Sequence, residues 1–351
     1  MDLNESIVYA GGEFVPYGDA KVGLLTHGLN YGTGCFEGIR GYWNAQEREL
    51  NLLQLRDHFE RLQISAKTLL MSVPHSVDEL VEITLDLCAR NRFESDVYIR
   101  PLVYKAAEDV GVRLTGVPDA FAIIVVPFLP YYHAPSGLKC GVSSWRRIDD
   151  TMAPARAKIT GTYINSALAK SEAQLNGFDE AILLSHDGHV AEGSAANLFL
   201  MRNGTLYTPD PTQNVLEGIT RRSVLTLARV ELGLPILERA LDRSELYGAD
   251  EIFFTGTAAS VSYVSSVDHR RVADGMMGPV TRKLVDLFAR ITSGREPAYR
   301  SWLTPVYANR RLGEAYLPRG VVATDLMGEL ASRVPAGSAA PSGLASAPVE
   351  S

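Results

Sequence analysis

Two lysines stand in the stretch "ARAKITGTYINSALAKSEAQLNG" (155–177), and their positions differ. Lys170 lies in a helical pattern, nearly opposite Leu168 at 100° per residue, which predicts a solvated surface lysine. Lys158 stands where the helix is expected to begin, although a helix N-terminus disfavours a cation and no acidic residue is adjacent. Because the dipole and the loss of water both disfavour its charged form, such an amine can attack a carbonyl carbon. Lys158 is therefore a candidate nucleophile.

An ordinary surface lysine is the alternative for Lys158, and three features further along the chain favour the chemical interpretation. Glu192 in "HVAEGSAAN" follows a short apolar strand, where a carboxylate can hold a protonated pyridine nitrogen. Ile219 and Thr220 in "LEGITRRS", and Thr257 in "FFTGTAAS", follow glycines at turns where backbone N–H groups and hydroxyls can bind phosphate. The sequence has neither a GxxxxGK[ST] nor a GxGxxG motif, so these features together favour pyridoxal phosphate over a nucleotide.

The composition excludes several classes of protein. The 351 residues are 46% hydrophobic and 21% charged, as expected for a globular protein with room for two domains. A net charge of −7 without a dense Lys/Arg run argues against a nucleic-acid partner. No secretory signal and no apolar run long enough for a membrane span are visible. Cys35, Cys88 and Cys140 form no CxxC motif, which favours reduced thiols and a cytoplasmic location.

Apolar periodicity predicts the elements that must position these residues. Apolar residues at spacings of three and four, from Leu52 to Leu69, predict an amphipathic helix over 50–71, and Ser76 with Glu79 predicts a capped helix over 76–91. Strand patterns follow in "VYIRPLVYK" and "DAFAIIVVPFL". Further along, Asn203-Gly204 predicts a hairpin turn.

A proline-rich stretch with aromatic residues, "PYYHAPSG", divides the pattern into two halves. We predict an N-terminal α/β domain over 1–128, an interdomain loop over 129–137 and a C-terminal cofactor-binding domain over 138–305. The default site is the cleft between the domains. Residues 306–351 form a C-terminal extension that is rich in Ala, Ser, Pro and Gly towards its end, and we predict disorder from about residue 335.

Eight segments, in the same order along the chain, resemble the branched-chain amino-acid aminotransferases among the fold-type-IV pyridoxal-phosphate enzymes. The resemblance runs from about residue 7 to about residue 305. The segments are "HGLNYGTGCFEGIR", "LRDHFERLQISAKTL", "YIRPLVY", "SSWRR", "ARAKITGTYINSALAKSEA", "VAEGSAANLF", "LYTPDPTQNVLEGITRRS" and "ADEIFFTGTAAS". The resemblance implies a two-domain α+β fold like that of D-amino-acid aminotransferase, with the cofactor in the interdomain cleft.

The resemblance implies a role for each candidate on the cofactor side. Lys158 resembles the lysine that forms the Schiff base and moves the proton between the substrate's α-carbon and the cofactor. Tyr163 resembles the phenol that bonds the ring hydroxyl, and Glu192 resembles the partner of the ring nitrogen. The remaining matches are to phosphate-binding residues: Arg61, Ile219, Thr220 and Thr257. On position alone, Arg61 is equally a solvated arginine on a helix face.

On the substrate side, the resemblance implies a mainly aromatic wall for an aliphatic side chain. Arg100 in "YIRP" resembles the residue that accepts the second carboxylate of glutamate, and Arg40 belongs to the family pattern without an assigned role. The backbone at Thr257–Ala258 is expected to bind the α-carboxylate, so Ala258 joins the substrate residues. The aromatic candidates, for which core packing is the alternative, are Tyr31, Phe36, Tyr98, Phe128 and Tyr131; some of them are expected to act across a dimer interface.

The chain departs from the family pattern next to Glu192. The family usually reads "EGSGENLF", whereas this chain reads "EGSAANLF", so Ala195 and Ala196 replace a glycine and an acidic residue. Ser260 and Tyr263 also differ from the usual pattern. These departures leave the cofactor residues intact and bear on substrate identity.

The implied activity is transfer of the amino group of L-leucine, L-isoleucine or L-valine to 2-oxoglutarate, by a homodimer or a larger homo-oligomer. The alternatives are a D-amino-acid or (R)-amine transaminase, an aminodeoxychorismate lyase, and a pyridoxal-phosphate-binding protein without turnover. The first two share the cofactor residues and differ in the pocket or in the reaction. The last is suggested only by Ala195 and Ala196.

Overall fold

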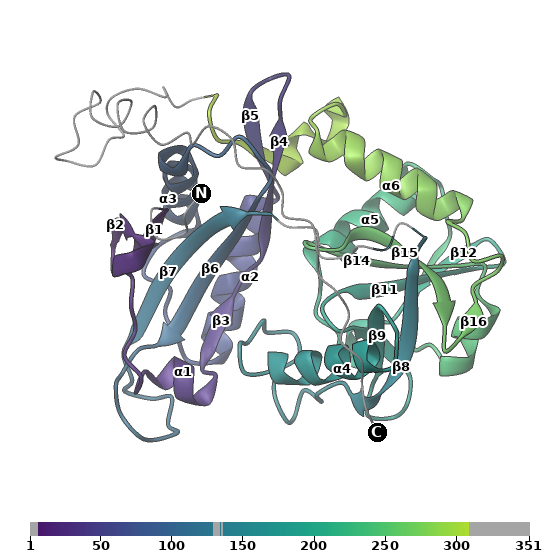
Figure 1. Ribbon diagram of the computed structural model, residues 1–351, viewed down its shortest axis with the longest axis horizontal. Helices are drawn as coiled ribbons and strands as arrows, with labels where there is room; N and C mark the ends of the chain where they lie inside the picture. The colour runs from purple at the N-terminus through teal and green to yellow at the C-terminus, as the bar shows by residue number, and fades with distance from the viewer. Residues whose placement is uncertain (1–5, 129–133, 135, 309–351) are drawn as a thin grey trace, which may run out of the picture. The chain divides into compact units, whose positions relative to one another are not determined.

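The computed structural model describes residues 6–128, 134 and 136–308, which form two β-sheets flanked by helices (Figure 1). All of them belong to one compact unit, Met1–Arg311. Tyr131 and nearly all of the predicted loop 129–137 lie outside the described residues, as does the predicted extension beyond residue 308. The division into domains at that loop therefore stays a prediction.

The first sheet is built mainly from the N-terminal third of the chain. Its eight strands run in the order β17 (Leu303–Pro305), β5 (Glu49–Leu53), β4 (Ile39–Asn44), β6 (Val97–Lys105), β7 (Asp119–Pro127), β1 (Ile7–Ala10) and β2 (Glu13–Pro16), with β3 (Gly34–Phe36) paired to β6. Its helices are α1 (His27–Tyr31), α2 (Leu55–Thr68) and α3 (Val77–Asn91). The late strand β17 pairs with β5, so the chain returns to this sheet near residue 303.

Helix α3 forms where the sequence predicts it, whereas α2 is shorter than the predicted helix over 50–71, because Glu49–Leu53 forms strand β5 and pairs with β4 and β17. Ser76 caps α3 in a capping box with Glu79, which satisfies two backbone N–H groups at the helix start. The apolar side of α2 is buried through Leu55, Phe59 and Leu62, and these residues pack in one core with the strands. The opposite, polar side of α2 carries the charged side chains that reach the site.

The second sheet has nine strands in the order β10 (Val190–Gly193), β9 (Glu180–Leu184), β8 (Leu138–Arg146), β15 (Ser260–Val267), β14 (Glu251–Gly256), β11 (Asn197–Arg202), β12 (Thr205–Thr208) and β13 (Ile236–Glu238), with β16 (Arg270–Arg271) paired to β15. A further pairing of Glu192 in β10 with Asn197 in β11 joins the first strand of this order to the sixth. Six strands therefore close into a ring, and Glu192 lies at the closure. The predicted Asn203-Gly204 turn connects β11 and β12, with both residues at positive φ as a type I′ turn requires.

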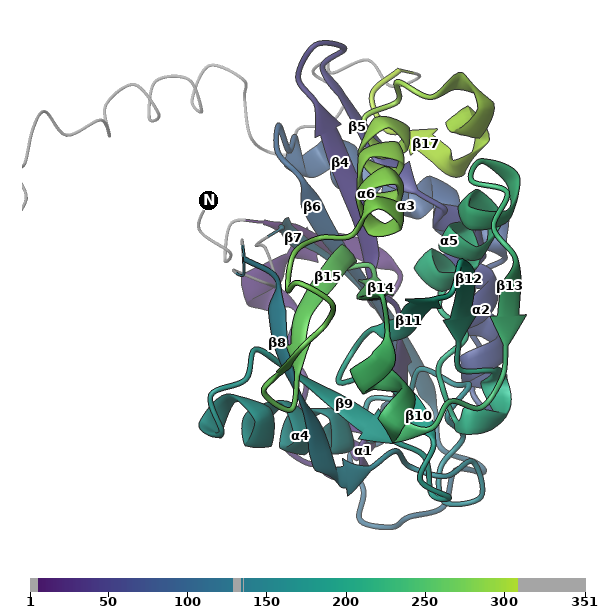
Figure 2. The same ribbon diagram turned by 90° about the vertical axis from the view of Figure 1, so that its right-hand side faces the viewer.

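Three helices cover the second sheet. They are α4 (Tyr163–Leu175), α5 (Ile219–Val230) and α6 (Pro279–Thr292). Helix α4 contacts β8 and β9, whereas α5 and α6 both contact β14 (Figure 2). Short 3-10 helices complete the described elements: η2 (Tyr17–Asp19), η3 (Pro211–Gln213), η4 (Arg243–Gly248) and η5 (Pro297–Trp302).

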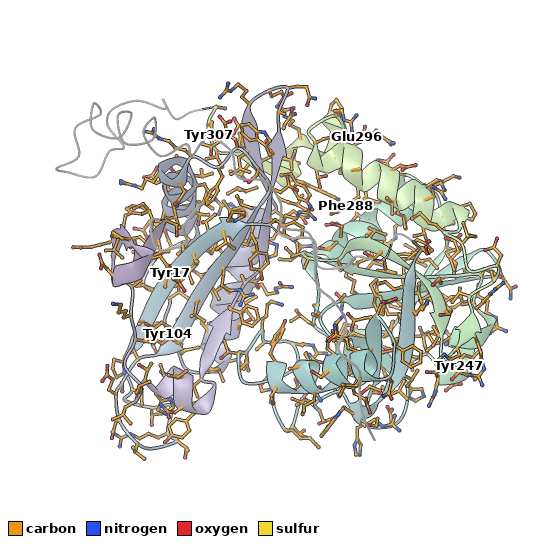
Figure 3. The ribbon with its side chains drawn as sticks, in the orientation of Figure 1. Tyr17, Tyr104, Tyr247, Phe288, Glu296 and Tyr307 are labelled. Atoms are coloured by element: carbon orange, nitrogen blue, oxygen red, sulfur yellow. The ribbon has the colours of Figure 1, made fainter. Side chains whose placement is uncertain are left out.

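One hydrophobic core contains residues from both sheets. Leu53 of β5 and Leu303 of β17 belong to the same buried cluster as Phe253 of β14 and Phe288 of α6, which is labelled in Figure 3. This shared core holds β5, and the start of α2 that follows it, against the second sheet. Among the residues that the structure describes, no helix has the length and apolar composition that a membrane span requires.

Candidate active site

A cavity of about 640 Å³ gathers most of the predicted site residues. Its wall includes Lys158, Tyr163, Glu192, Arg61, Ile219, Thr220, Thr257, Ala258, Phe36, Tyr98, Arg100 and Phe128. Two predicted residues, Tyr31 and Arg40, lie outside this wall. Residues from eight separate stretches of the chain therefore meet at one place, although Phe36 and Ala258 stand 222 positions apart in the sequence.

Lys158 is held from both sides by backbone hydrogen bonds. Its N–H donates to Ser65 Oγ of α2 at 3.1 Å, and its carbonyl accepts from Phe36 N at 3.0 Å. The prediction that a helix begins at Lys158 is wrong, because α4 begins five residues later at Tyr163. Before the helix, a turn brings Gly161 against the backbone of Gly32, so closely that a side chain at Gly32 would collide with it.

The amine of Lys158 lies against the first residue of α4. Its Nζ donates to Tyr163 Oη at 2.6 Å, and it stands 4.9 Å from the centroid of the Phe36 ring. Phe36 and Tyr163 contact each other edge to face, with their centroids 4.8 Å apart. The amine is thus fixed between two rings and points into the cavity, where it can reach a carbonyl carbon or an α-proton.

Glu192 is a buried carboxylate on β10 with three partners. Arg147 Nε lies 2.9 Å from Oε1, and Oε2 accepts hydrogen bonds from Asn197 Nδ2 at 3.0 Å and from Leu216 N at 3.2 Å. Burial raises the pKa of Glu192 above its ordinary value, while the charge of Arg147 acts in the opposite direction. A carboxylate in this position gains from a second positive group, such as a protonated ring nitrogen.

The start of α5 offers free backbone N–H groups to an anion. Gly218 precedes the helix without any side-chain cap, and Ile219 and Thr220 form the first turn. Thr257, in the turn after β14, lies on the same cavity wall, and its hydroxyl donates to the carbonyl of Gly38 at 2.9 Å. These groups suit a phosphate, as the sequence predicted.

Arg61 reaches from α2 to the end of the cavity where α5 begins. Its Nε and Nη2 donate to the two carboxylate oxygens of Glu37 at 2.7 and 2.8 Å, and Nη1 donates to the carbonyl of Glu217 at 3.0 Å. The alternative of a solvated helix-face arginine is therefore wrong. Glu37 and His58, which bonds the same carboxylate, were missed by the sequence analysis.

The opposite wall combines aromatic rings with one guanidinium. Arg100 Nη2 donates to Tyr98 Oη at 2.8 Å, and the guanidinium carbon lies 4.3 Å from the centroid of the Phe36 ring. Arg100 Nε is buried and has no hydrogen-bond partner among the described residues. Phe128 completes this wall, which therefore suits an aliphatic chain and can also bind a carboxylate.

Arg40 and Tyr31 stand behind or beside the cavity. Arg40 lies 3.8 Å from the centroid of the Phe128 ring, and its guanidinium bonds Asp96 at 2.8 Å and Ser260 Oγ at 2.9 Å. This arrangement makes Arg40 a support for Phe128. Tyr31 ends α1, and its hydroxyl accepts from Gly111 N at 3.2 Å.

The prediction that Lys170 is a solvated surface lysine is wrong. Its side chain is only 18% exposed and pairs with the buried Glu180 at 2.9 Å, so it is not a solvated surface lysine. Glu180 also accepts from Ser194 N at 3.3 Å, at the start of the segment that carries Ala195 and Ala196. The pair thus holds this segment, which lines the cavity.

Comparison with known proteins defines the class to which this fold and cavity belong. Residues 34–267 match the family model for amino-transferase class IV, and the chain belongs to that family. It is therefore a fold-type-IV transaminase that uses pyridoxal phosphate. The converging lysine, phenol, carboxylate and helix N-terminus fit that cofactor.

The similar proteins carry one activity in their names. A probable branched-chain-amino-acid aminotransferase of Aquifex aeolicus is 45% identical over 84% of this chain and 95% of its own length. The branched-chain-amino-acid aminotransferase of Pseudomonas aeruginosa is 40% identical over 87% and 99%.

Solved structures of the same kind superpose over most of the chain. The branched-chain aminotransferase of Thermoproteus uzoniensis with norvaline has a TM-score of 0.82 and 42% identity, covering 86% of this chain and 99% of its own. The pyridoxal-phosphate form of the Thermobaculum terrenum enzyme has a TM-score of 0.83 and 39% identity, covering 87% and 99%. The predicted fold class and cofactor are thus confirmed.

Proposed function

We propose that this transaminase moves the amino group of L-leucine, L-isoleucine or L-valine to 2-oxoglutarate, giving the branched 2-oxo acid and L-glutamate. The observation that carries the proposal is that Lys158 faces an aromatic wall containing a single guanidinium, that of Arg100, across one cavity. The names of the similar proteins support a branched-chain amino acid as the amino donor.

The cofactor residues divide into three groups. Arg61, Ile219, Thr220 and Thr257 would hold the phosphate, Tyr163 the ring hydroxyl, and Glu192 the ring nitrogen. Bound pyridoxal phosphate supplies an electron sink that makes the α-hydrogen of an attached amino acid acidic. Glu192 strengthens this sink because its buried negative charge favours a protonated ring nitrogen.

Lys158 is the residue that moves the proton. Its amine would take the proton from the substrate's α-carbon and pass it to the cofactor. One base would therefore serve both the removal and the delivery of the proton. The hydrogen bond to Tyr163 Oη limits the positions of Nζ, and the ring of Phe36 limits the water that reaches it. The same amine would hold the cofactor covalently, since a lysine amine condenses with an aldehyde with loss of water.

The wall of Phe36, Tyr98, Arg100 and Phe128 distinguishes the two substrates of the reaction. Aromatic surfaces bury an aliphatic side chain, whose burial contributes about 25 cal/mol per Å². Arg100 would bind the second carboxylate of 2-oxoglutarate or glutamate through donors that Tyr98 leaves free. The Ala258 backbone would hold the α-carboxylate common to both substrates.

A homodimer or larger homo-oligomer is part of the proposal. Large apolar side chains are exposed on the loop before α1, on α1 itself and on the loop between β6 and β7: Leu24, Leu25, Leu29, Val110 and Val112. A patch of this kind marks a protein–protein interface, and a partner subunit could place its Tyr31 at the cavity mouth. A cytoplasmic location is also proposed, since Cys35, Cys88 and Cys140 are buried and none of them forms a disulfide.

The test is a single half-reaction of the cofactor-loaded protein with L-leucine, D-alanine and an (R)-amine, each supplied separately. The proposal predicts that only L-leucine converts the cofactor to pyridoxamine phosphate, which its absorption spectrum reports. Conversion with D-alanine or the amine alone would identify a different transaminase. No conversion with any donor would favour the lyase or the inactive binder.

A further inference from the structure

The carboxylate of Glu37 lies fully buried at the phosphate-binding end of the cavity. Glu37 follows β3 and precedes Gly38, whose carbonyl accepts from Thr257 Oγ1. Its two oxygens bind the Nε and Nη2 groups of Arg61 side by side, and His58 Nδ1 lies 2.7 Å from Oε2. Glu37 thus binds one proposed phosphate-binding residue, Arg61, and precedes the glycine whose carbonyl binds another, Thr257.

The donors of Arg61 are only partly used by these contacts. A guanidinium has five N–H groups, of which two bind Glu37 and one binds the carbonyl of Glu217. Two N–H groups, one on each Nη, are left for an anion. Because Glu217 directly precedes Gly218, the same guanidinium is tied to the loop that opens α5.

The charges of Glu37, Arg61 and His58 determine the electrostatic environment that an incoming phosphate meets. The pKa of Glu37 lies far below its ordinary value, because the charge and hydrogen bonds of Arg61 outweigh the opposing effect of burial. Burial lowers the pKa of His58, which leaves its ring neutral. Glu37 and Arg61 therefore neutralise each other, and an arriving phosphate meets a guanidinium that already has a counter-ion.

We propose that Glu37 is the resident counter-ion of Arg61, which stabilises the apoprotein and competes with the cofactor's phosphate for the guanidinium. Glu37 is a positioning residue here, since it acts through Arg61. The inference rests on the proposed role of Arg61 in binding phosphate. The role proposed for Glu37 differs from that of a purely structural ion pair, which would stabilise the protein equally with and without phosphate.

The experiment measures binding of inorganic phosphate to the apoprotein by calorimetry, together with the unfolding temperature at zero and saturating phosphate. For Glu37→Gln, the unfolding temperature of the apoprotein should fall, since Arg61 loses its counter-ion. Phosphate then takes that place, so its binding should become about tenfold tighter and the gap between the two unfolding temperatures should widen. Equal falls with and without phosphate, or unchanged or weaker binding, would overturn the inference.

Two further variants keep the test decisive if Glu37→Gln does not fold. Glu37→Asp keeps the charge but withdraws it from Arg61, so phosphate binding should tighten by about twofold to threefold; unchanged or weaker binding would count against the inference. Glu251→Gln is the matched control, because Glu251 is a buried carboxylate at the opposite end of β14 that accepts from Thr281 N and Oγ1. It should lower both unfolding temperatures equally.

Arg61→Met separates this inference from the function on which it rests. If Arg61 binds phosphate, its loss should weaken binding of inorganic phosphate and of pyridoxal phosphate by at least about tenfold. An unchanged affinity would show that the phosphate assignment itself is wrong. A loss of affinity in Arg61→Met without tighter binding in Glu37→Gln would reject only the role of Glu37.

Discussion

The two walls of the cavity differ in how their charged groups are satisfied. On the cofactor side, Glu192 pairs with Arg147 and Arg61 pairs with Glu37, each at 2.7 to 2.9 Å. On the substrate side, Arg100 has a buried Nε without a partner among the described residues and is held mainly by ring contacts. The ion pairs of the cofactor side are therefore already formed before any ligand binds, whereas Arg100 on the substrate side keeps N–H donors that a ligand can bind.

This difference matches what each wall must accommodate. A cofactor stays in place through both half-reactions, so its wall can be fixed by ion pairs. A pocket that accepts leucine and then 2-oxoglutarate must bind an apolar chain and a carboxylate at the same place. Changes on the cofactor wall should therefore affect every substrate equally, and changes on the substrate wall should separate one substrate from the other.

Loss of the lysine at the junction of the two walls should have the largest effect. Lys158→Ala removes the proton-transfer group and the covalent link, so transamination should fall by about 10⁴-fold for all donors. Steady-state assays with leucine and valine measure this. Lys170→Ala serves as the control and should keep activity within about tenfold, because Lys170 lines the same cavity but its Nζ is bound to Glu180 and to the carbonyl of Asp179. Substantial activity in Lys158→Ala would refute the assignment.

A neutral replacement on the cofactor wall should lower the rate for all substrates by a similar factor. Glu192→Gln keeps the size of the side chain but loses the charge that favours a protonated ring nitrogen, and we expect kcat to fall by about 10²-fold. The ratio of rates for leucine and glutamate should stay constant. A change in that ratio would mean that Glu192 takes part in substrate selection.

A change on the substrate wall should affect one substrate selectively. Arg100→Met should lower kcat/KM for 2-oxoglutarate by about 10²-fold, because the second carboxylate loses its charged partner. The half-reaction with leucine should change by less than about threefold. Arg40→Met is the comparison, because Arg40 lies outside the cavity wall, against Phe128, and pairs with Asp96; the change should affect both substrates modestly and alike. Equal losses for both substrates in Arg100→Met would contradict the division between the walls.

The smallest effect should appear in the pH dependence of stability. The pKa of Glu37 is lower in the folded than in the unfolded protein, so its contribution to stability is present above its ordinary value and is lost as the pH falls below about 4.5. On acid unfolding, the Glu37→Gln protein should therefore take up about one proton fewer than the unsubstituted protein. Denaturant titrations between pH 5 and pH 3.5 measure this slope. An unchanged slope would show that Glu37 does not titrate on unfolding.

The sequence predicted elements and residues whose cause is local. The capping box at Ser76 and Glu79, the Asn203-Gly204 turn and the apolar side of α2 depend on neighbours in the chain, and all of them formed as expected. Among the candidates that line the cavity, Lys158, Glu192, Ile219, Thr220 and Thr257 were selected from position and residue type, and the others were found through family motifs.

Features that depend on distant contacts were missed or misjudged. Lys158 was placed at a helix start, whereas Ser65 and Phe36 fix it before that helix begins. Lys170 was expected in solvent because helical periodicity does not reveal that Glu180 of a neighbouring strand pairs with it. Arg147 and Glu37 were not selected, although both lie in the quoted motifs "SSWRR" and "FEGIR", since only the fold shows that they pair with site residues.

The most direct test of the whole account identifies the lysine that carries the cofactor. Pyridoxal-phosphate-loaded protein is reduced with borohydride, digested and analysed by mass spectrometry. The account predicts the phosphopyridoxyl group on the peptide that contains Lys158, with none on Lys170. Modification of Lys170, or of any lysine outside the cavity, would contradict it.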